Sequence, residues 1–399
     1  MKKIIAISVM LALVAGAVFA DTTISGYVET RFSLAKQMAN KAADGSTPDP
    51  VMGGSIGSAY LTLSGSNGDG TLGGTYRLRG HDVWRSSPWI YKAFVWWKPV
   101  EQVKVFLGIE QDGLFDTADF MGWGYHSGDN DYLFNHHWDF WRQIFPGNWD
   151  GFGLALSFYP IPGFDLNLVL PTGGINWPQA TSAQVGATRP ITNPDSDTHT
   201  GMIPGRIRFS GSYSLDFGKI SFAYIGGAAV TEKGVQFGYA TADNNGLIGA
   251  SVLVTAVDGI LIKVGGSAVL NGKNAADKTE MLISGGFGVA YSGDGFGVKA
   301  RVGLVTQGEA KMFLTGSILP YFKVGEKGEV MIDIGVTNDG NKDPAMGWFV
   351  TPAYRLGIDG GNFKIGLQLF NNVDAGGNIQ ITGADYVKWN IPMLLAFVF

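Results

Sequence analysis

Ionisable side chains gather in one segment of this sequence, residues 112–150. The segment holds seven aspartates against the single arginine Arg142, together with three of the five histidines. Histidines beside carboxylates can perform acid–base chemistry, and clustered carboxylates can bind divalent cations. However, "NHHWD" and "GDND" have no serine or aspartate at a spacing that fixes a catalytic arrangement, and "DNDYLFNHHWDF" lacks the glycine and glutamate of a calcium loop. We therefore predict no enzymatic activity, no metal site and no cofactor.

Basic residues are distributed differently, along segments in which polar and apolar residues alternate. Arg77 and Arg79 lie two positions apart, and Arg31, Lys92 and Lys104 also alternate with apolar neighbours. Alternation gives a β-strand two faces, so these basic side chains occupy the polar face of their strands. No cysteine is present, which excludes thiol chemistry, disulfides and thiolate metal sites. The net charge of −5 argues against a nucleic-acid partner.

The same alternation recurs after residue 20, in segments that end in turns. Examples are "VKVFLGIEQ", "FGLALSF" and "FKIGLQLF". Short connections with hairpin-turn compositions, such as "NGDG" at 67–70 and "SGDG" at 292–295, alternate with long polar connections such as 112–150 and 171–204. The 59 glycines favour turns and close strand contacts over long helices.

Strands joined by short turns at one end and long loops at the other are typical of a transmembrane β-barrel. The composition agrees, because 45% of the residues are hydrophobic and only 16% are charged, where about a quarter is usual in soluble proteins. We predict an all-β fold, a transmembrane antiparallel barrel over residues 21–399 with short periplasmic turns and long outer loops. Both chain ends then lie on the short-turn side, which requires an even number of strands. We count 18 strands, with residues 219–242 contributing one, and 16 is the fallback.

The first 20 residues are typical of a cleaved export signal peptide. Lys2 and Lys3 precede an apolar stretch at 4–14, and small residues lead to Asp21. A membrane-spanning helix would need about 18 or more consecutive apolar residues, and no such run follows residue 20. We expect residues 1–20 to be removed on export.

The chain ends in "VKWNIPMLLAFVF", in which every second residue is large and apolar. This ending resembles the C-terminal signature of bacterial outer-membrane barrels, and together with the loop pattern the chain resembles a porin of no identified subfamily. The resemblance implies location in the bacterial outer membrane and contact with its lipid. It also implies that Phe399 and Phe397 form an assembly signal for the barrel assembly machinery. Phe399 would pair with the first strand, "TTISGYVETRFSL".

A barrel of 16 or 18 strands is too wide for its own side chains to fill, so we expect a water-filled channel for passive diffusion of small hydrophilic solutes. Resemblance to general diffusion porins implies that the third long connection, residues 112–150, folds inward and narrows the pore. An acidic loop facing a basic wall would set a transverse field across the pore. Alternatively, the arginines only pair with loop carboxylates and pin the fold. The acidic side would be Asp116, Asp119, Asp129 and Asp131, and the basic side Arg31, Arg77, Arg79, Lys92 and Lys104. The same resemblance implies a homotrimer.

Aromatic residues support a second hypothesis, a carbohydrate-selective channel similar to maltoporins. Nine tryptophans fall between residues 84 and 177, and lumen-facing rings can stack on sugars. Outward tryptophans such as Trp97 fit the lipid-interface girdle instead. A third hypothesis is a structural or adhesive barrel plugged by residues 112–150, with 171–204 as its contact surface. The residues eligible for solute stacking are Trp96, Trp123, Trp138 and Trp141.

Overall fold

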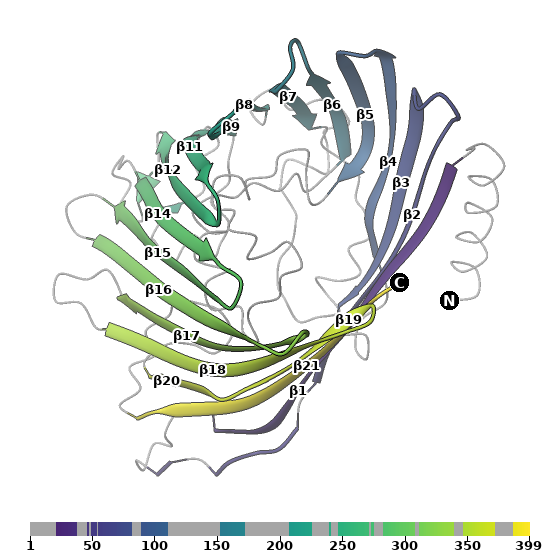
Figure 1. Cartoon of the computed structure of the whole chain (residues 1–399). Helices are drawn as coiled ribbons and strands as arrows, with labels where there is room; N and C mark the ends of the chain where they lie inside the picture. Colours follow the sequence, from purple (N-terminus) through teal and green to yellow (C-terminus); the bar gives the residue numbers. More distant parts are fainter. Residues whose placement is uncertain are drawn as a thin grey trace.

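The structure is a computed structural model in which β-strands and the turns between them predominate (Figure 1). It describes residues 21–37, 46–47, 49–53, 55–81, 89–110, 152–171, 207–225, 239–240, 246–270, 273–274, 282–307, 311–338, 346–371 and 386–399. Within these ranges no helix is long and apolar enough to cross a membrane. The predicted signal peptide at residues 1–20 lies outside them.

The described residues form strands β1 to β21 in chain order. The first half contains β1 (Asp21–Gln37), β2 (Ser55–Ser66), β3 (Leu72–His81), β4 (Trp89–Val100), β5 (Val103–Glu110), β6 (Phe152–Phe158), β7 (Phe164–Pro171), β8 (Arg208–Leu215), β9 (Gly218–Ile225) and β10 (Tyr239–Ala240). The second half contains β11 (Gly246–Val257), β12 (Ile260–Leu270), β13 (Lys273–Asn274), β14 (Leu282–Ser292), β15 (Phe296–Gln307), β16 (Lys311–Val324), β17 (Gly328–Asn338), β18 (Met346–Ile358), β19 (Gly361–Gly366), β20 (Gln368–Asn371) and β21 (Lys388–Val398).

These strands form a closed antiparallel barrel of 18 strands, because β21 returns to pair with β1 (Figure 1). β19 and β20 count as one barrel strand, since both pair with β18 on one side and β21 on the other. Their ladder is interrupted at Leu367, near Pro352 of β18, which has no N–H to donate. The predicted all-β barrel and its count of 18 are confirmed, and the fallback of 16 is not needed.

Among its described residues, the region we counted as one strand, residues 219–242, contributes β9 alone to the barrel. β10 pairs with β13 in a separate two-stranded sheet. A second barrel strand in this region would have broken the even count that places both ends of the barrel on one rim. The prediction of a single strand in this region is confirmed.

Short turns and long connections alternate around the barrel, as predicted. On one rim β11 and β12 are joined by residues 258–259, and β18 and β19 by residues 359–360. Gly259 and Gly360 have φ angles of 73° and 74°, in the left-handed region that tight hairpins require and glycine adopts without steric cost. On the opposite rim most connections are longer, with residues 111–151 between β5 and β6 and residues 172–207 between β7 and β8. We call these the short-turn rim and the long-connection rim.

The alternation in β21 gives the barrel wall one inner and one outer face. From Lys388 to Ala396 every second residue is buried, whereas the intervening positions are partly exposed. Phe397 is 41% exposed and Phe399 is 69% exposed. The large apolar residues of the closing strand therefore face outward, where lipid would cover them.

The seam between β1 and β21 closes the barrel and begins at its short-turn rim. The Gly26 N–H donates to the Phe399 carbonyl over 2.7 Å, and the Phe399 N–H donates to the Gly26 carbonyl over 3.0 Å. Pairing continues to Gln37 opposite Trp389, whose Nε1–H donates to the Gln37 side-chain oxygen over 3.0 Å. The predicted pairing of Phe399 with the first strand is confirmed.

Gly26 makes room for the terminal aromatic ring. A Cβ atom at this position would overlap the ring of Phe399, so the ring lies directly over the Gly26 backbone on the outer face. This packing couples the last residue of the chain to the first strand through side-chain contact as well as through backbone hydrogen bonds.

The substitution Gly26→Ala should lower the free energy of unfolding by about 1–3 kcal/mol, because the methyl group must displace the Phe399 ring. Urea unfolding in lipid vesicles measures this change. Gly316→Ala is the matched control, since its added Cβ would meet no atom closer than 3.6 Å. Equal losses in the two variants would show that the ring does not pack on Gly26.

Candidate functional site: the inner wall of the barrel

Buried polar side chains mark the inner face of the strands. Ser221 of β9 pairs with Ser251 of β11, and both are buried, as is Lys263 of β12. Their sequence neighbours Phe222 and Val264 point the other way and are exposed. The inner face is thus polar and the outer face apolar, the reverse of a soluble domain with a hydrophobic core.

Basic side chains outnumber acidic ones on the described part of the inner wall. The strand registers place on this face the basic residues Lys36, Arg77, Lys98, Lys104, Lys219, Lys263, Lys299, Arg301, Lys323, Arg355, Lys364 and Lys388, and the acidic residues Glu29, Asp165, Glu329 and Asp333. Charges of one sign lining a low-dielectric cleft raise the local concentration of counter-ions. The described part of the wall therefore carries a net positive charge.

The inner wall beside the seam is shielded from solvent. Lys364 and Leu394 lie opposite each other on β19 and β21, and each is only 1% exposed. Leu394 and Ala396 form a small apolar cluster with Tyr27 and Ala353. The polar groups of the wall that reach solvent therefore lie away from the seam.

Strands β1 to β3 hold Arg77 against the wall. Its Nε–H donates to Thr62 Oγ1 over 2.8 Å, and its guanidinium carbon lies 5.8 Å from the centre of the Tyr60 ring. Tyr60 in turn packs on Tyr27, with ring centres 5.6 Å apart, and the Tyr27 hydroxyl donates to the Glu29 carboxylate. The charge of Arg77 therefore has a fixed position on the inner wall.

Strands β4 and β5 carry a patch of aromatic rings with lysines over them. The Lys104 ammonium lies 4.3 Å from the centre of the Trp96 ring and 4.6 Å from that of Phe106, and Phe106 packs on Phe94 at 5.8 Å. Trp96 lies over Gly73 of β3, where any Cβ atom would collide with the indole. One part of this indole therefore faces backbone and another faces the ammonium, a favourable cation–π arrangement. We call Phe94, Trp96, Phe106 and Lys104 the aromatic patch.

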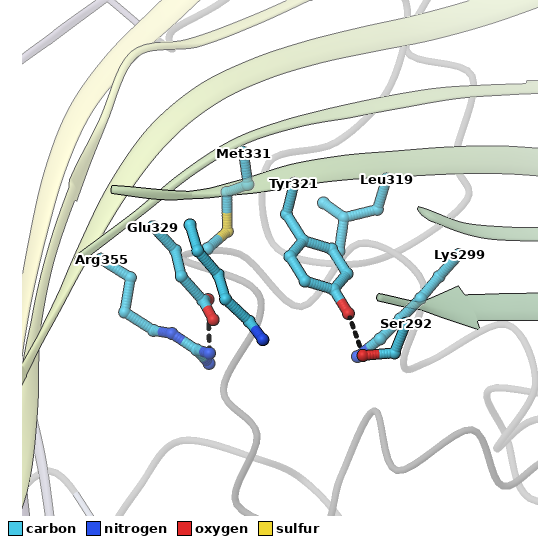
Figure 2. A pocket seen from close by; sticks show the side chains of 8 residues that line it. Ser292, Lys299, Leu319, Tyr321, Glu329, Met331 and Arg355 are labelled. Carbon is cyan, nitrogen blue, oxygen red and sulfur yellow. Dashed lines mark hydrogen bonds and ion pairs between the residues drawn. The ribbon is translucent and has the colours of Figure 1, made fainter. Parts of the chain in front are cut away.

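Strands β14 to β18 form a recess of about 170 Å³ on the inner wall (Figure 2). We call it the mouth recess, and it is lined by Ser292, Lys299, Leu319, Tyr321, Lys323, Glu329, Met331 and Arg355. Leu319 and Met331 are 1% and 3% exposed and supply its apolar lining. The polar side chains project from the wall toward the same side (Figure 2).

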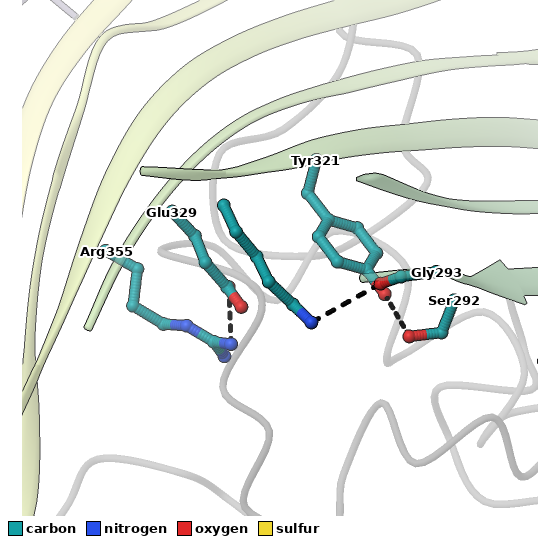
Figure 3. Close-up of polar contacts among 6 residues, drawn as sticks. Ser292, Gly293, Tyr321, Glu329 and Arg355 are labelled. Carbon is teal, nitrogen blue, oxygen red and sulfur yellow. Dashed lines mark hydrogen bonds and ion pairs between the residues drawn. The ribbon is translucent and has the colours of Figure 1, made fainter. Parts of the chain in front are cut away.

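Polar contacts fix the side chains of the mouth recess. Arg355 forms an ion pair with Glu329, and the two side chains are 27% and 18% exposed. The Tyr321 hydroxyl donates to Ser292 Oγ over 3.0 Å, and Lys323 Nζ donates to the Gly293 carbonyl over 3.3 Å (Figure 3). These side chains are held by contacts with the wall itself. Their charges are therefore in place before any ligand binds.

The predicted site residues fall into three groups. Arg77, Lys104 and Trp96 are described and lie on the inner wall, which agrees with their predicted side. Arg31, Arg79 and Lys92 are described only through their backbones, which pair with Leu394, Tyr60 and Arg77 respectively. The acidic residues Asp116, Asp119, Asp129 and Asp131 and the tryptophans Trp123, Trp138 and Trp141 lie outside the described residues, so the acidic side of the predicted constriction stays a prediction.

Sequence reasoning missed the charged residues of β15 to β18. Lys299 and Arg301 stand two positions apart in "GVKARVGL", the same spacing that drew attention to Arg77 and Arg79. The alternation could therefore have found them. The gathering of Lys299, Lys323 and Arg355 around one recess could not be found in this way, because it depends on five strands meeting in a particular register.

The described residues contain no group of three or more histidine, aspartate or glutamate side chains that could hold a metal ion. The arrangement of the inner wall instead offers fixed charges along a polar surface. Such a surface can attract, orient and release small ions and polar solutes.

A pair of cysteine variants tests the assignment of the two faces. Lys104→Cys should react with a water-soluble thiol reagent in lipid vesicles, and Val105→Cys should not, because neighbouring residues of β5 face opposite sides of the wall. The native chain has no cysteine, so there is no background reaction. Comparable labelling rates for the two variants would contradict the assignment.

Comparison with known proteins relates the chain to porins through structure alone. No protein-family model and no curated protein sequence matches it. OccD3 (OpdP) of Pseudomonas aeruginosa superposes with a TM-score of 0.53 at 9% identity, covering 96% of this chain and 92% of that one. The outer membrane protein OmpT of Vibrio cholerae, in a trimer form, gives a TM-score of 0.49 at 10% identity over 95% and 99% of the two chains. OmpF of Salmonella typhi gives 0.47 at 11% identity over 95% and 97%. The chain thus has the fold of a bacterial outer-membrane porin, realised as a closed barrel of 18 antiparallel strands.

Proposed function

We propose that the protein is a channel of the bacterial outer membrane through which small hydrophilic solutes diffuse passively. The observation that supports it best is the contrast between the two faces of a closed barrel. Lysines, arginines, serines and threonines occupy the inner face, while exposed apolar side chains occupy the outer face. A basic residue facing the bilayer midplane would cost about 2–4 kcal/mol, so this distribution suits a barrel that spans a membrane around water.

The width of the barrel supports an open lumen. Eight strands enclose an interior that side chains fill, whereas barrels of about 16–18 strands leave an aqueous channel. Permeation then depends on what narrows the channel. Residues 112–150, the connection between β5 and β6, remain our candidate for that role, with their aspartates facing the basic wall.

Export and assembly complete the proposal. Residues 1–20 direct export and are removed, and Phe399 and Phe397 are read by the barrel assembly machinery before the barrel contacts outer-membrane lipid. The barrel acts as a homotrimer and performs no catalysis. These parts rest on the sequence and its resemblance to porins.

Single-channel recording of the refolded protein in a planar bilayer tests the proposal. We expect stable open steps in simple salt. Replacing Arg77 and Arg79 by glutamine should shift the reversal potential in a salt gradient toward cation preference, because positive charge leaves the inner wall. Lys327→Gln is the control, since Lys327 lies in a short turn, paired with Asp359 over 2.7 Å, and should leave selectivity unchanged. An unchanged reversal potential in the arginine variant would remove these residues from the permeation path.

The aromatic patch is the observation that favours a carbohydrate-selective channel. Phe94 and Trp96 could offer ring faces to a sugar, but Lys104 lies over the Trp96 ring and over the buried Phe106 beside it. A sugar would have to displace this ammonium before it could stack. We therefore rank general diffusion above sugar selectivity.

Added maltooligosaccharides should leave the open steps unaltered if Lys104 keeps the rings covered. Lys104→Met should then increase sugar block, because methionine is uncharged and makes no cation–π contact that would keep it over the indole. Block of the unmodified channel by these sugars would favour the carbohydrate-selective channel instead. If the folded protein gives no conductance steps, the plugged structural or adhesive barrel would be favoured.

A further inference from the structure

We propose that the bonds Asp258–Gly259 and Asp294–Gly295 are sites of spontaneous covalent modification, at which aspartate isomerises to isoaspartate in the folded barrel. Both bonds lie in turns of the short-turn rim, the first between β11 and β12 and the second between β14 and β15. The reaction needs only the chain itself and water. The inference therefore does not depend on the proposed channel function.

The reaction begins when the amide nitrogen of the glycine attacks the Cγ carbon of the preceding, protonated aspartate. A C–N bond forms, the Cγ–OH bond breaks, and the hydroxyl leaves as water with the amide proton, which closes a five-membered succinimide ring. Water then adds to a ring carbonyl and breaks its bond to nitrogen. Opening at the carbonyl on the Cα side leaves the main chain one carbon longer and the mass unchanged. Glycine has no Cβ to hinder this attack or the turn that permits it.

The described short turns contain four Asp–Gly bonds, and the same two residue types react in each. All four aspartates are exposed, so access to water does not separate them. They differ in what holds the carboxyl group, which must rotate toward the glycine nitrogen before the ring can close. The four aspartates are Asp69, Asp258, Asp294 and Asp359.

The turn at residues 67–71 protects Asp69 through its own hydrogen bonds. Asp69 Oδ1 accepts from the Thr71 N–H over 3.0 Å and from the Thr71 hydroxyl over 2.7 Å. The attacking nitrogen is engaged as well, because the Gly70 N–H donates to the Asn67 carbonyl over 2.9 Å. The bond from the Thr71 hydroxyl, followed by that from the Thr71 N–H, holds the pKa of Asp69 below its usual value. Less of this side chain is therefore in the protonated form that reacts.

Asp359 is held by a single contact. Its carboxylate forms an ion pair with Lys327 Nζ over 2.7 Å, and the two side chains are 97% and 56% exposed. Ion pairs between exposed side chains are weak, because water and salt screen them. We therefore expect Asp359 to react at a rate between that of Asp69 and those of the other two aspartates.

The carboxylates of Asp258 and Asp294 have no hydrogen-bond donor and no ion-pair partner among the described residues. Space beside the second turn is open, since a Cβ added at Gly295 would meet no atom within 4 Å. Both carboxyl groups can therefore rotate toward the nitrogen of the glycine that follows them. These are the two turns in which the fold does not oppose the reaction.

Isomerisation would loosen the rim at these two turns. The Gly259 carbonyl accepts from the Ser292 N–H over 2.7 Å, and the Gly295 carbonyl accepts from the Lys323 N–H over 3.0 Å. Each bond joins a turn to the next strand along the rim, β14 in the first case and β16 in the second. A main chain that is one carbon longer displaces the accepting carbonyl. We expect both hydrogen bonds to weaken after modification.

Peptide mapping of aged, folded protein tests the proposal. The protein is held in lipid vesicles for several weeks at mildly acidic pH, in water enriched in a heavy oxygen isotope that every ring opening incorporates. Chromatography separates isoaspartyl from aspartyl peptides, and mass spectrometry measures the isotope. Isoaspartate should accumulate at Asp258 and Asp294 at least about fivefold faster than at Asp69, because each hydrogen bond that must first break slows the reaction a few fold. Equal rates at the three positions would overturn the proposal.

Unfolded protein and one variant show whether the fold sets this ranking. In urea all four bonds should react at similar rates, because their hydrogen bonds and ion pair are lost. Thr71→Val removes the hydroxyl donor and should speed isomerisation at Asp69 in the folded protein by about two- to fivefold, while leaving Asp294 unchanged. The folded-state ranking persisting in urea, or no change at Asp69 in Thr71→Val, would overturn the structural account.

Hydrogen exchange measures the consequence for the rim. The amides of Ser292 and Lys323 should exchange faster in aged protein than in fresh protein, because their acceptors have moved. A variant with Asp258→Glu and Asp294→Glu is the matched control, since glutamate would have to close a larger and less favourable ring. Its exchange should not change on ageing. Unchanged exchange in aged protein that carries isoaspartate at both turns would overturn the predicted loosening.

Discussion

Pairing between β1 and β21 is the interaction on which the rest of the structure depends. In lipid every backbone N–H and C=O must find a partner within the protein, and a sheet with free edges cannot meet that requirement. The seam removes both edges at once, through the register that runs from Tyr27 opposite Val398 to Gln37 opposite Trp389. The hydrogen bonds between Gly26 and Phe399 extend it to the last residue. An even number of strands follows from this closure, because every neighbouring pair, including β1 and β21, is antiparallel.

Closure also dictates where the charges lie. Because the outer face must remain apolar, ionisable residues of the strands are confined to the inner face, toward which every second side chain of a strand points. The wall then holds them by short-range contacts, such as Arg301 Nε–H donating to Ser317 Oγ over 3.1 Å and Lys104 lying over Trp96. Fixed charges on a rigid wall give a field that does not depend on the solute. The charges that the barrel can hold are therefore those on its inner wall.

The architecture could be predicted from the sequence because two simple periodicities determine it. Alternation within "VKWNIPMLLAFVF" gave its outward face correctly, and the order of short and long connections gave 18 strands. The candidate site was predicted only in part. Arg77, Lys104 and Trp96 lie on the inner wall as expected, but the contact of Trp96 with Gly73 depends on the β3–β4 register, which periodicity does not fix. The mouth recess draws its residues from 292 to 355, and no local pattern brings such distant positions together.

The most direct test of this account is the conductance of a barrel locked shut across its seam. Tyr27 and Val398 lie opposite each other, so cysteines at these positions should form a disulfide on oxidation, whereas cysteines at Tyr27 and Ala396 are offset by two residues and should cross-link poorly. The account predicts that oxidised Tyr27→Cys/Val398→Cys protein retains stable open steps in a planar bilayer. Loss of the steps on locking, or failure of the opposed pair to cross-link, would contradict a closed barrel that conducts through its own lumen.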